Sequence, residues 1–230
     1  MDTKNIVVLT GAGVSAESGI KTFRDSGGLW EEYDVMTVAS IDGWRRNPAL
    51  VQEFYNKRRK ELESAEPNEA HRILARLEEK FNVEIITQNV DNLHERGGST
   101  KVTHLHGELT KARSSENLSL ISEIGYRAIE KGEKASDGSM LRPHIVWFGE
   151  AVDMMEPAVE KVMRADILVI AGTSMNVYPA AGLVEYAPRN IPVYIIDPND
   201  VNYTGNRKII FIREKASIGM KRLYDILTAQ

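Results

Sequence analysis

The stretch from residue 6 to residue 24, IVVLTGAGVSAESGIKTFR, decides the fold of this chain. Residues 6–9 are four branched apolar residues, too few for a helix and typical of a strand buried on both faces of a parallel sheet. A glycine turn at 11–13 follows, and residues 15–20 can begin a helix. This order predicts an anion-binding turn, because backbone N–H groups and the helix dipole favour negative charge there.

The turn fits the dinucleotide pattern G-x-G-x-x-A at positions 11, 13 and 16. Gly11 permits a tight turn, Gly13 permits close approach of a pyrophosphate, and Ala16 keeps the helix close to the sheet. Alone the pattern is weak, since glycine turns after buried strands also occur in folds that bind nothing. Instead of a long helix, the polar segment KTFRDSGGLW follows at 21–30, which predicts a mobile lid beside the phosphate site.

The composition of the 230 residues is ordinary for a globular protein, with 42% apolar and 27% charged residues. The length allows one large domain with or without a small appendage. The net charge of −4 gives no basic field, so we expect no nucleic-acid partner. No apolar run approaches the roughly 20 residues of a membrane span, and the first residues show no signal peptide. We therefore expect a cytoplasmic protein without membrane contact.

Cysteine is absent, which excludes disulfides, a thiol nucleophile and thiolate metal ligands. The histidines lie at positions 71, 94, 104, 106 and 144, and no two have the H-x3–5-H spacing of a metal site. His104 and His106 would point their rings the same way on a strand, but no carboxylates at matching spacing accompany them. We therefore predict that the protein holds no metal.

Short apolar strands alternate with helices through most of the chain. Helices are expected within 31–80, at 156–164 and at the C-terminal end, and the later strands at 83–87, within 101–106, at 167–171, at 193–196 and at 209–212. This alternation predicts an α/β fold with a Rossmann-type, doubly wound parallel sheet. Between about 111 and 140 the pattern dissolves, which indicates an inserted small module or a long loop.

Five motifs in order resemble those of the sirtuin family, the NAD-dependent protein lysine deacylases. They are GAGVSAESGI at 11–20, TQNVDNLH at 87–94, LHGE at 105–108, VWFGE at 146–150 and GTS at 172–174. The resemblance covers nearly the whole chain. It implies a Rossmann-type NAD-binding domain of residues 1–30, 81–107 and 142–230, with a small module made by two insertions, residues 31–80 and 108–141.

The resemblance implies that NAD lies across the first glycine turn. Phe23 and Arg24 would be lid residues over the ribose and phosphates, and Val90 would contribute through its backbone. Asp197 stands where the family usually has Asn, and a carboxylate can still accept from ribose hydroxyls. The implied cofactor-binding residues are Gly11, Ala12, Gly13, Thr22, Phe23, Arg24, Trp30, Gln88, Asn89, Val90, Asp91, Gly172, Thr173, Ser174, Asp197, Pro198, Asn199 and Ala216.

The resemblance gives His106 the central chemical role, with Asn89 and Asp91 as the other catalytic residues. In the family's reaction the acyl oxygen attacks C1′ of the nicotinamide ribose and nicotinamide leaves. A neutral imidazole then takes a proton from a ribose hydroxyl, which suits a histidine with a pKa of about 6.5. An isolated histidine before Gly107 would more simply cap a strand. Within LHGE, and together with QNVD, we favour catalysis.

The chain departs from the family at its zinc site. Family members usually hold a zinc with four cysteines in the small domain, and this chain has no cysteine. Ser114 lies where the first ligand cysteine is expected, and residues 115–140 offer no replacement. Because that zinc is usually structural, activity need not be lost. We expect the small module to be held by its own apolar contacts.

Tyr55 and Arg58 bear on the acyl group. They are three residues apart on a predicted helix and so share a face. Tyr-x-x-Arg at this place resembles the bacterial class III subgroup, which removes acidic acyl groups such as succinyl and malonyl. A guanidinium binds a carboxylate bidentately and a phenol adds one donor. The alternative is that Arg58 belongs to a solvated basic run, residues 57–60.

The VWFGE stretch completes the implied substrate site. In the family its backbone pairs with the substrate peptide as an added strand, while its apolar side chains form the wall of the acyl-lysine tunnel. Trp147 and Phe148 could also be core aromatics. The implied substrate-binding residues are Tyr55, Arg58, Val146, Trp147, Phe148 and Gly149.

We expect an enzyme that removes succinyl, malonyl or acetyl groups from protein lysines and releases nicotinamide and O-acyl-ADP-ribose. Its partners would be acylated proteins or peptides, and we expect a monomer. An ordinary NAD-dependent dehydrogenase would need an acidic residue after a second strand about 20 residues on, where helical sequence stands. A non-catalytic NAD or ADP-ribose sensor would share the fold. Release of free nicotinamide from NAD and an acylated peptide separates enzyme from sensor.

Overall fold

The computed structural model describes residues 3–21, 33–175, 180–199, 201 and 207–229. A six-stranded sheet has the order β3-β2-β1-β7-β8-β9. Its strands are β1 (Asn5–Thr10), β2 (Asn82–Thr87), β3 (Val102–His104), β7 (Ile167–Ala171), β8 (Val193–Ile196) and β9 (Ile209–Ile212). Every neighbouring pair is parallel, which confirms the predicted doubly wound α/β sheet.

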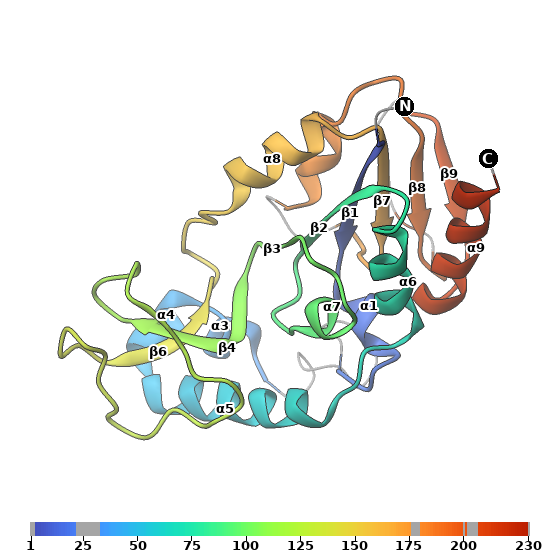
Figure 1. Ribbon diagram of the computed structural model, residues 1–230. Helices are drawn as coiled ribbons and strands as arrows, with labels where there is room; N and C mark the ends of the chain where they lie inside the picture. Colours follow the sequence, from blue (N-terminus) through green and yellow to red (C-terminus); the bar gives the residue numbers. More distant parts are fainter. Residues whose placement is uncertain (1–2, 22–32, 176–179, 200, 202–206, 230) are drawn as a thin grey trace.

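Helices cover both faces of this sheet. They are α6 (Glu69–Leu77) and α9 (Ala216–Thr228) on one face, and α8 (Met155–Met163) and the 3-10 helix η1 (Ala180–Tyr186) on the other. Figure 1 shows α6 and α9 on the side opposite α8. Ile6 and Val8 of β1 face the first pair, and Val7 faces the second. Burial on both faces explains why β1 is a continuous apolar run. None of the described helices has the length and apolarity that a membrane crossing requires.

The turn after β1 packs directly on the turn after β7. Gly11 N–H donates to Ala171 O (3.0 Å) and Gly13 N–H to Gly172 O (2.9 Å), just where the short helix α1 (Ala12–Ala16) begins. A Cβ on Gly13 would lie 2.8 Å from the Cα of Gly172. Glycine is therefore required here because two backbone turns touch. The N–H groups of Gly11 and Gly13 thus already have partners inside the protein, and the close approach of a pyrophosphate to Gly13 stays a prediction.

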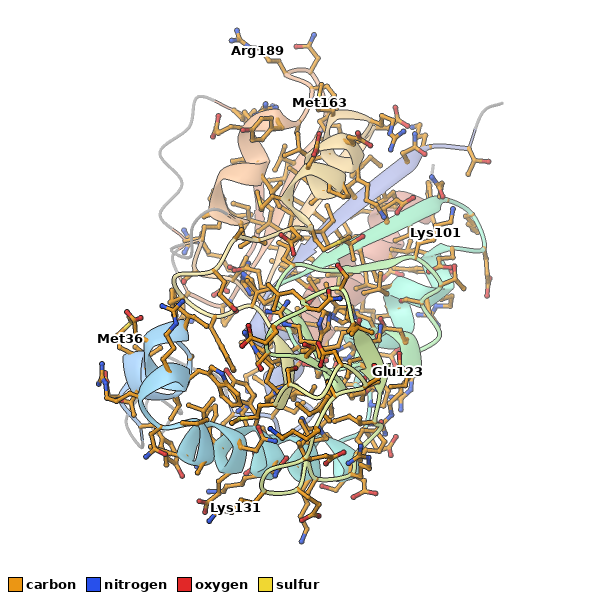
Figure 2. The ribbon with its side chains drawn as sticks, turned by 90° about the vertical axis from the view of Figure 1, so that its left-hand side faces the viewer. Met36, Lys101, Glu123, Lys131, Met163 and Arg189 are labelled. Carbon is orange, nitrogen blue, oxygen red and sulfur yellow. The ribbon has the colours of Figure 1, made fainter. Side chains whose placement is uncertain are left out.

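A smaller module lies beside this sheet (Figure 1). Its elements are α3 (Val35–Val38), α4 (Ile41–Arg46), α5 (Pro48–Ser64), β4 (Gly107–Ser114), β5 (Ile121–Glu123) and β6 (Leu141–Ile145), with α7 (Leu93–Arg96) between the two halves in sequence. The strands form an antiparallel sheet in the order β5-β4-β6. In Figure 2, Lys131 marks the small-module end of the molecule, and Met163 and Arg189 mark the opposite end.

The packing differs from the predicted domain boundaries at two elements. The apolar side of α6, with Ile73 and Leu74, joins the core of the six-stranded sheet, although the sequence placed it in the inserted module. Strand β6 pairs with β4 in the small sheet, although it was placed mostly with the large domain. Both differences arise because long-range packing, not sequence order, decides which core a short element joins. Helix α5 begins directly after Asn47, whose side chain accepts from Leu50 N–H (3.1 Å).

The small module has the apolar contacts that were expected, and polar contacts that were not. Ala112, Ile124, Ile129 and Leu141 form a small cluster of buried side chains. At the position where a ligand cysteine was expected, Ser114 Oγ lies 2.6 Å from Asp137 Oδ2 and 2.8 Å from Ser139 Oγ, and it accepts from the backbone N–H groups of residues 116 and 117. A hydrogen-bond cluster thus ties the end of β4 to the segment at residues 137–139. Among the described residues no three metal-ligating side chains come together.

Candidate functional site

A cavity of about 670 Å³ runs from the carboxyl ends of β1, β7 and β8 to the small module. Most of the predicted site residues line it. They are Gly11, Ala12, Gly13, Tyr55, Gln88, Asn89, Val90, His106, Val146, Trp147, Phe148, Gly149, Gly172, Thr173, Ser174, Asp197, Pro198, Asn199 and Ala216. Asp91 and Arg58 do not line the cavity and are buried, 5% and 6% exposed. The predicted lid residues Thr22, Phe23, Arg24 and Trp30 lie outside the described residues.

His106 lies in the cavity wall just after β3. Its Nδ1 is 3.0 Å from the carbonyl oxygen of Gln88. Because a carbonyl only accepts, Nδ1 carries the proton and Nε2 is the unprotonated nitrogen. Burial lowers the pKa of His106, and the bond to Gln88 offsets only part of that effect. The ring is therefore neutral at neutral pH, with one nitrogen able to accept a proton.

His104, two residues earlier, has the opposite protonation state. Its Nδ1 is 3.1 Å from Asn89 O and its Nε2 is 2.8 Å from Glu95 Oε1. Both partners are acceptors, so both ring nitrogens must donate and the ring is an imidazolium. Burial opposes the charge, but the hydrogen bond and charge of Glu95 outweigh it and raise the pKa of His104. The Nδ1 atoms of His106 and His104 thus face consecutive backbone carbonyls after β2, those of Gln88 and Asn89.

Ser15 joins the first turn to the segment after β2, a role that the motifs did not reveal. Asn89 Nδ2 donates to Gly11 O (3.0 Å) and to Ser15 Oγ (3.1 Å). Ser15 Oγ in turn donates to Asp91 Oδ2 (2.9 Å). Burial raises the pKa of Asp91, and its bonds to Leu93 N–H and Ser15 offset part of the shift. Asp91 thus acts on the cavity through Ser15 and Asn89.

The turn after β7 is linked to His106 through Gln88. Gln88 Nε2 donates to Thr173 Oγ1 (3.1 Å), and the carbonyl of the same Gln88 holds His106. Asp197 follows β8, and its Oδ1 accepts from Asn199 N–H (2.9 Å). These contacts bring the GTS and QNVD motifs together, as the parallel sheet requires.

Tyr55, on α5, lines the part of the cavity in the small module, and Arg58 lies three residues later on the same helix without lining the cavity. Tyr55 is 4% exposed, and its hydroxyl accepts from Trp147 Nε1–H (3.1 Å). Burial raises the pKa of Tyr55 to about 12, so it stays a neutral phenol. Arg58 is 6% and Arg59 0% exposed, so these two residues do not belong to a solvated basic face. Burial lowers the pKa of Arg58, and Tyr55, Glu61 and Asp91 oppose that effect.

The VWFGE stretch is paired along one edge by the chain itself. Phe148 N–H donates to Ala39 O (2.9 Å) and Phe148 O accepts from Ile41 N–H (3.0 Å). The backbone of Trp147 also has partners inside the chain, since its N–H donates to Glu150 Oε2 (2.9 Å) and its carbonyl accepts from Glu150 N–H (3.0 Å). Trp147 is both a core aromatic and part of the cavity wall, at 2% exposed, whereas Phe148 is 42% exposed.

The sequence model of the Sir2 family matches residues 11–179 of the chain. The chain is 57% identical over 229 residues to an NAD-dependent protein deacylase of Bacteroides thetaiotaomicron, an alignment that covers 97% of this chain and 98% of that protein. Two solved structures are similar at 38% identity: a variant Sir2 homologue in complex with ADP-ribose, with a TM-score of 0.88, and a Sir2 homologue in complex with NAD, with a TM-score of 0.86. The matches cover 100% and 99% of this chain, and 95% and 91% of those chains.

Proposed function

The chain belongs to the Sir2 family, and from this premise we propose that it is an NAD-dependent protein deacylase that removes succinyl and malonyl, as well as acetyl, from lysine side chains. The observation that carries the proposal is a single cavity that has the glycine turn at one end, neutral His106 in its wall and Tyr55 at the other end. The proposed products are nicotinamide and O-acyl-ADP-ribose. A monomer in the cytoplasm remains a prediction from the sequence.

The cavity residues fit NAD. The volume of about 670 Å³ lies in the range of small-molecule sites. Gly11, Ala12 and Gly13 put almost no side chain beside a pyrophosphate, and the Asp197 carboxylate can accept from ribose hydroxyls. When bound, NAD supplies an electrophilic ribose carbon and nicotinamide as the leaving group. The protein's part is to place these groups beside the acyl-lysine and the base.

His106 acts as the general base in this proposal. Gln88 O holds the proton on Nδ1, which leaves Nε2 to accept a proton from a ribose hydroxyl. The burial that lowers the His106 pKa keeps this nitrogen unprotonated. Asn89 is held in place by Gly11 O and Ser15 Oγ, so its position beside the base is fixed before substrate binds.

His106→Ala tests the base. We expect deacylation to fall by about 100-fold or more, the usual contribution of general base catalysis. NAD binding, measured by calorimetry, should stay within a few-fold, because the ring does not hold the adenosine end. Release of nicotinamide from NAD and an acylated peptide by the unaltered protein also separates an enzyme from a non-catalytic NAD sensor. Near-normal turnover of His106→Ala would remove the residue from the mechanism.

Arg58→Met tests the acyl group. If Tyr55 and Arg58 hold the acyl carboxylate away from water, loss of the Arg58 guanidinium should lower kcat/KM for a succinyl peptide by roughly tens- to thousands-fold. Acetyl turnover should change little or improve, because acetyl has no carboxylate. The matched control is Lys60→Met, an exposed residue of the same helix. Arg59→Met is not a suitable control, since Arg59 is fully buried and donates to Leu109 O. Equal effects on both peptides would refute the acidic-acyl assignment.

A further inference from the structure

The contact between Tyr55 and Trp147 joins α5 to the VWFGE stretch inside the cavity wall. Trp147 Nε1 lies 3.1 Å from the Tyr55 hydroxyl oxygen. The two side chains are 2% and 4% exposed, so water does not compete strongly for this bond. Both line the cavity that also contains His106. The contact therefore lies where an acyl-lysine would lie under the proposed function.

The direction of this hydrogen bond follows from chemistry. The indole N–H can only donate, so the Tyr55 oxygen must accept. The phenol keeps its own proton, because burial raises the pKa of Tyr55 to about 12. A phenol that accepts from Trp147 cannot also donate to it. Its proton is therefore left to donate to a different acceptor.

Trp147 is itself held on several sides. The Arg142 guanidinium lies 3.6 Å from the centre of its ring, and the Trp44 ring is 5.2 Å away. Arg142 also binds both carboxylate oxygens of Glu150, at 2.7 and 2.9 Å. Glu150 Oε2 then accepts the backbone N–H of Trp147 (2.9 Å). The same ion pair thus holds the ring and the backbone of Trp147.

We propose that Trp147, held by the Arg142–Glu150 pair, is a positioning residue that commits the Tyr55 hydroxyl to donate into the cavity. This inference rests on the proposed function and deepens it. The substrates it favours are acyl groups with an acceptor oxygen at their far end, of which a carboxylate is the strongest. Tyr55 would contact the substrate, whereas Trp147 would act through Tyr55.

Trp147→Phe removes the indole N–H and keeps an aromatic ring. The phenol can then rotate, so we expect the succinyl-to-acetyl ratio of kcat/KM to fall by roughly 5- to 20-fold, less than the loss of a full hydrogen bond to a charged group. Tyr55→Phe should lower the ratio at least as much. Because Trp147 acts through Tyr55, the double variant should match Tyr55→Phe alone.

Trp44→Phe is the matched control. Trp44 packs on Trp147 but makes no bond to Tyr55, so the loss of ring volume there should leave the ratio unchanged. If Trp147→Phe does not fold, benzothienylalanine at position 147 keeps the bicyclic ring and removes only the N–H. It should give the same fall in the ratio.

The outcomes separate the two proposals. If Arg58→Met leaves the ratio unchanged, the acidic-acyl function itself fails. If Arg58→Met lowers the ratio but Trp147→Phe does not, the positioning role alone is overturned. It is also overturned if the Trp147 and Tyr55 effects multiply, or if Trp44→Phe gives the same fall, because packing would then explain the result.

Discussion

The six-stranded sheet and the small module are stabilised by different kinds of interaction. Apolar side chains fill the clusters on both faces of the sheet. By contrast, all the arginines that are buried in the described part of the chain, namely Arg58, Arg59, Arg113 and Arg142, belong to the small module. Arg142 and Arg113 share one carboxylate, Glu150, at 2.7 and 3.2 Å. Both regions bury apolar side chains, but only the small module adds directional contacts of buried arginines in the described part of the chain.

This difference predicts how substitutions in each region lower the free energy of unfolding. In an apolar core, a smaller side chain costs stability in proportion to the volume removed. In a buried charged cluster, the loss of one charged group leaves its partners as uncompensated buried charges. Replacement of one oxygen by nitrogen can therefore lower the free energy of unfolding strongly. Replacements in the two regions, ordered by the size of the effect, test this difference.

Glu150→Gln should have the largest effect. It keeps the shape of the side chain but leaves two buried guanidiniums without a carboxylate, so we expect a loss of about 3–5 kcal/mol in the free energy of unfolding. Burial opposes ionisation of Glu150, yet its bonds to Arg142 and to Trp147 N–H hold its pKa below the usual value. Urea unfolding measures the loss. The control is Glu123→Gln, an exposed partner of Lys111, for which about 0–1 kcal/mol is expected.

Leu74→Ala in the core of the sheet should cost slightly less. Leu74 is 0% exposed between α6 and the sheet, and such truncations cost about 2–5 kcal/mol, with about 3 as the expected value. Leu74→Met, which conserves volume, should cost less than about 1.5 kcal/mol. Urea unfolding of both variants tests proportionality to volume. If Leu74→Met were as costly as Leu74→Ala, the contrast between the two regions would not hold.

Low pH should destabilise the core of the six-stranded sheet through one buried histidine. His71 on α6 is 0% exposed, and burial lowers its pKa from 6.5 to about 4. The unfolded chain therefore binds a proton at a higher pH than the folded one. Stability is full above pH 6.5 and falls as the pH drops toward 4, by on the order of 2–3 kcal/mol.

His71→Gln is the matched control for acid unfolding. His71 Nδ1 accepts from Asn68 N–H in a capping box, and a glutamine at this position can accept the same bond without titrating. The variant should lose less stability than the unaltered protein between pH 6.5 and 4. An identical pH dependence of the two would assign the acid sensitivity to other groups, of which buried His94 is the nearest.

Ser114→Ala should have the smallest effect. We expect the free energy of unfolding, measured in urea, to fall by about 1–2 kcal/mol through loss of the bonds to Asp137 and to two backbone N–H groups.

We also expect a chelator to change neither stability nor activity, and elemental analysis to find no stoichiometric zinc. Thermal unfolding with and without the chelator checks this. A chelator-sensitive transition would show that a metal, and not hydrogen bonds, holds the small module.

The sequence predicts the large sheet well because its strands carry their own signal. Residues 6–9 and 167–171 are apolar runs bounded by turn residues, and burial on both faces requires such runs. The small sheet has no such signal. Strand β5 is exposed throughout, and β4 pairs with β6 across more than 20 intervening residues. Those pairings depend on long-range contacts, which no local pattern contains.

The candidate site divides in the same way. His106 and Asn89 follow parallel strands whose ends meet at one edge of the sheet, and both line the cavity. Tyr55 lies on α5, and only the family resemblance assigned it to the substrate site. The roles of Ser15, His104 and Arg142 were not predicted, since each acts by a contact with a residue of another element or loop. A serine within a glycine turn or a histidine on a strand has no distinctive spacing, so only the folded contacts reveal these residues.

The contact between the turns after β1 and β7 is connected to His106 by a continuous series of contacts. Gly13 touches Gly172, the adjacent Thr173 accepts from Gln88, and the carbonyl of Gln88 sets the proton on His106. A methyl group added at residue 13 would push on the backbone of residue 172, and that displacement would travel along hydrogen bonds to the base. The orientation of the His106 imidazole thus depends on the absence of a side chain at residue 13, although the two residues are far apart in the sequence.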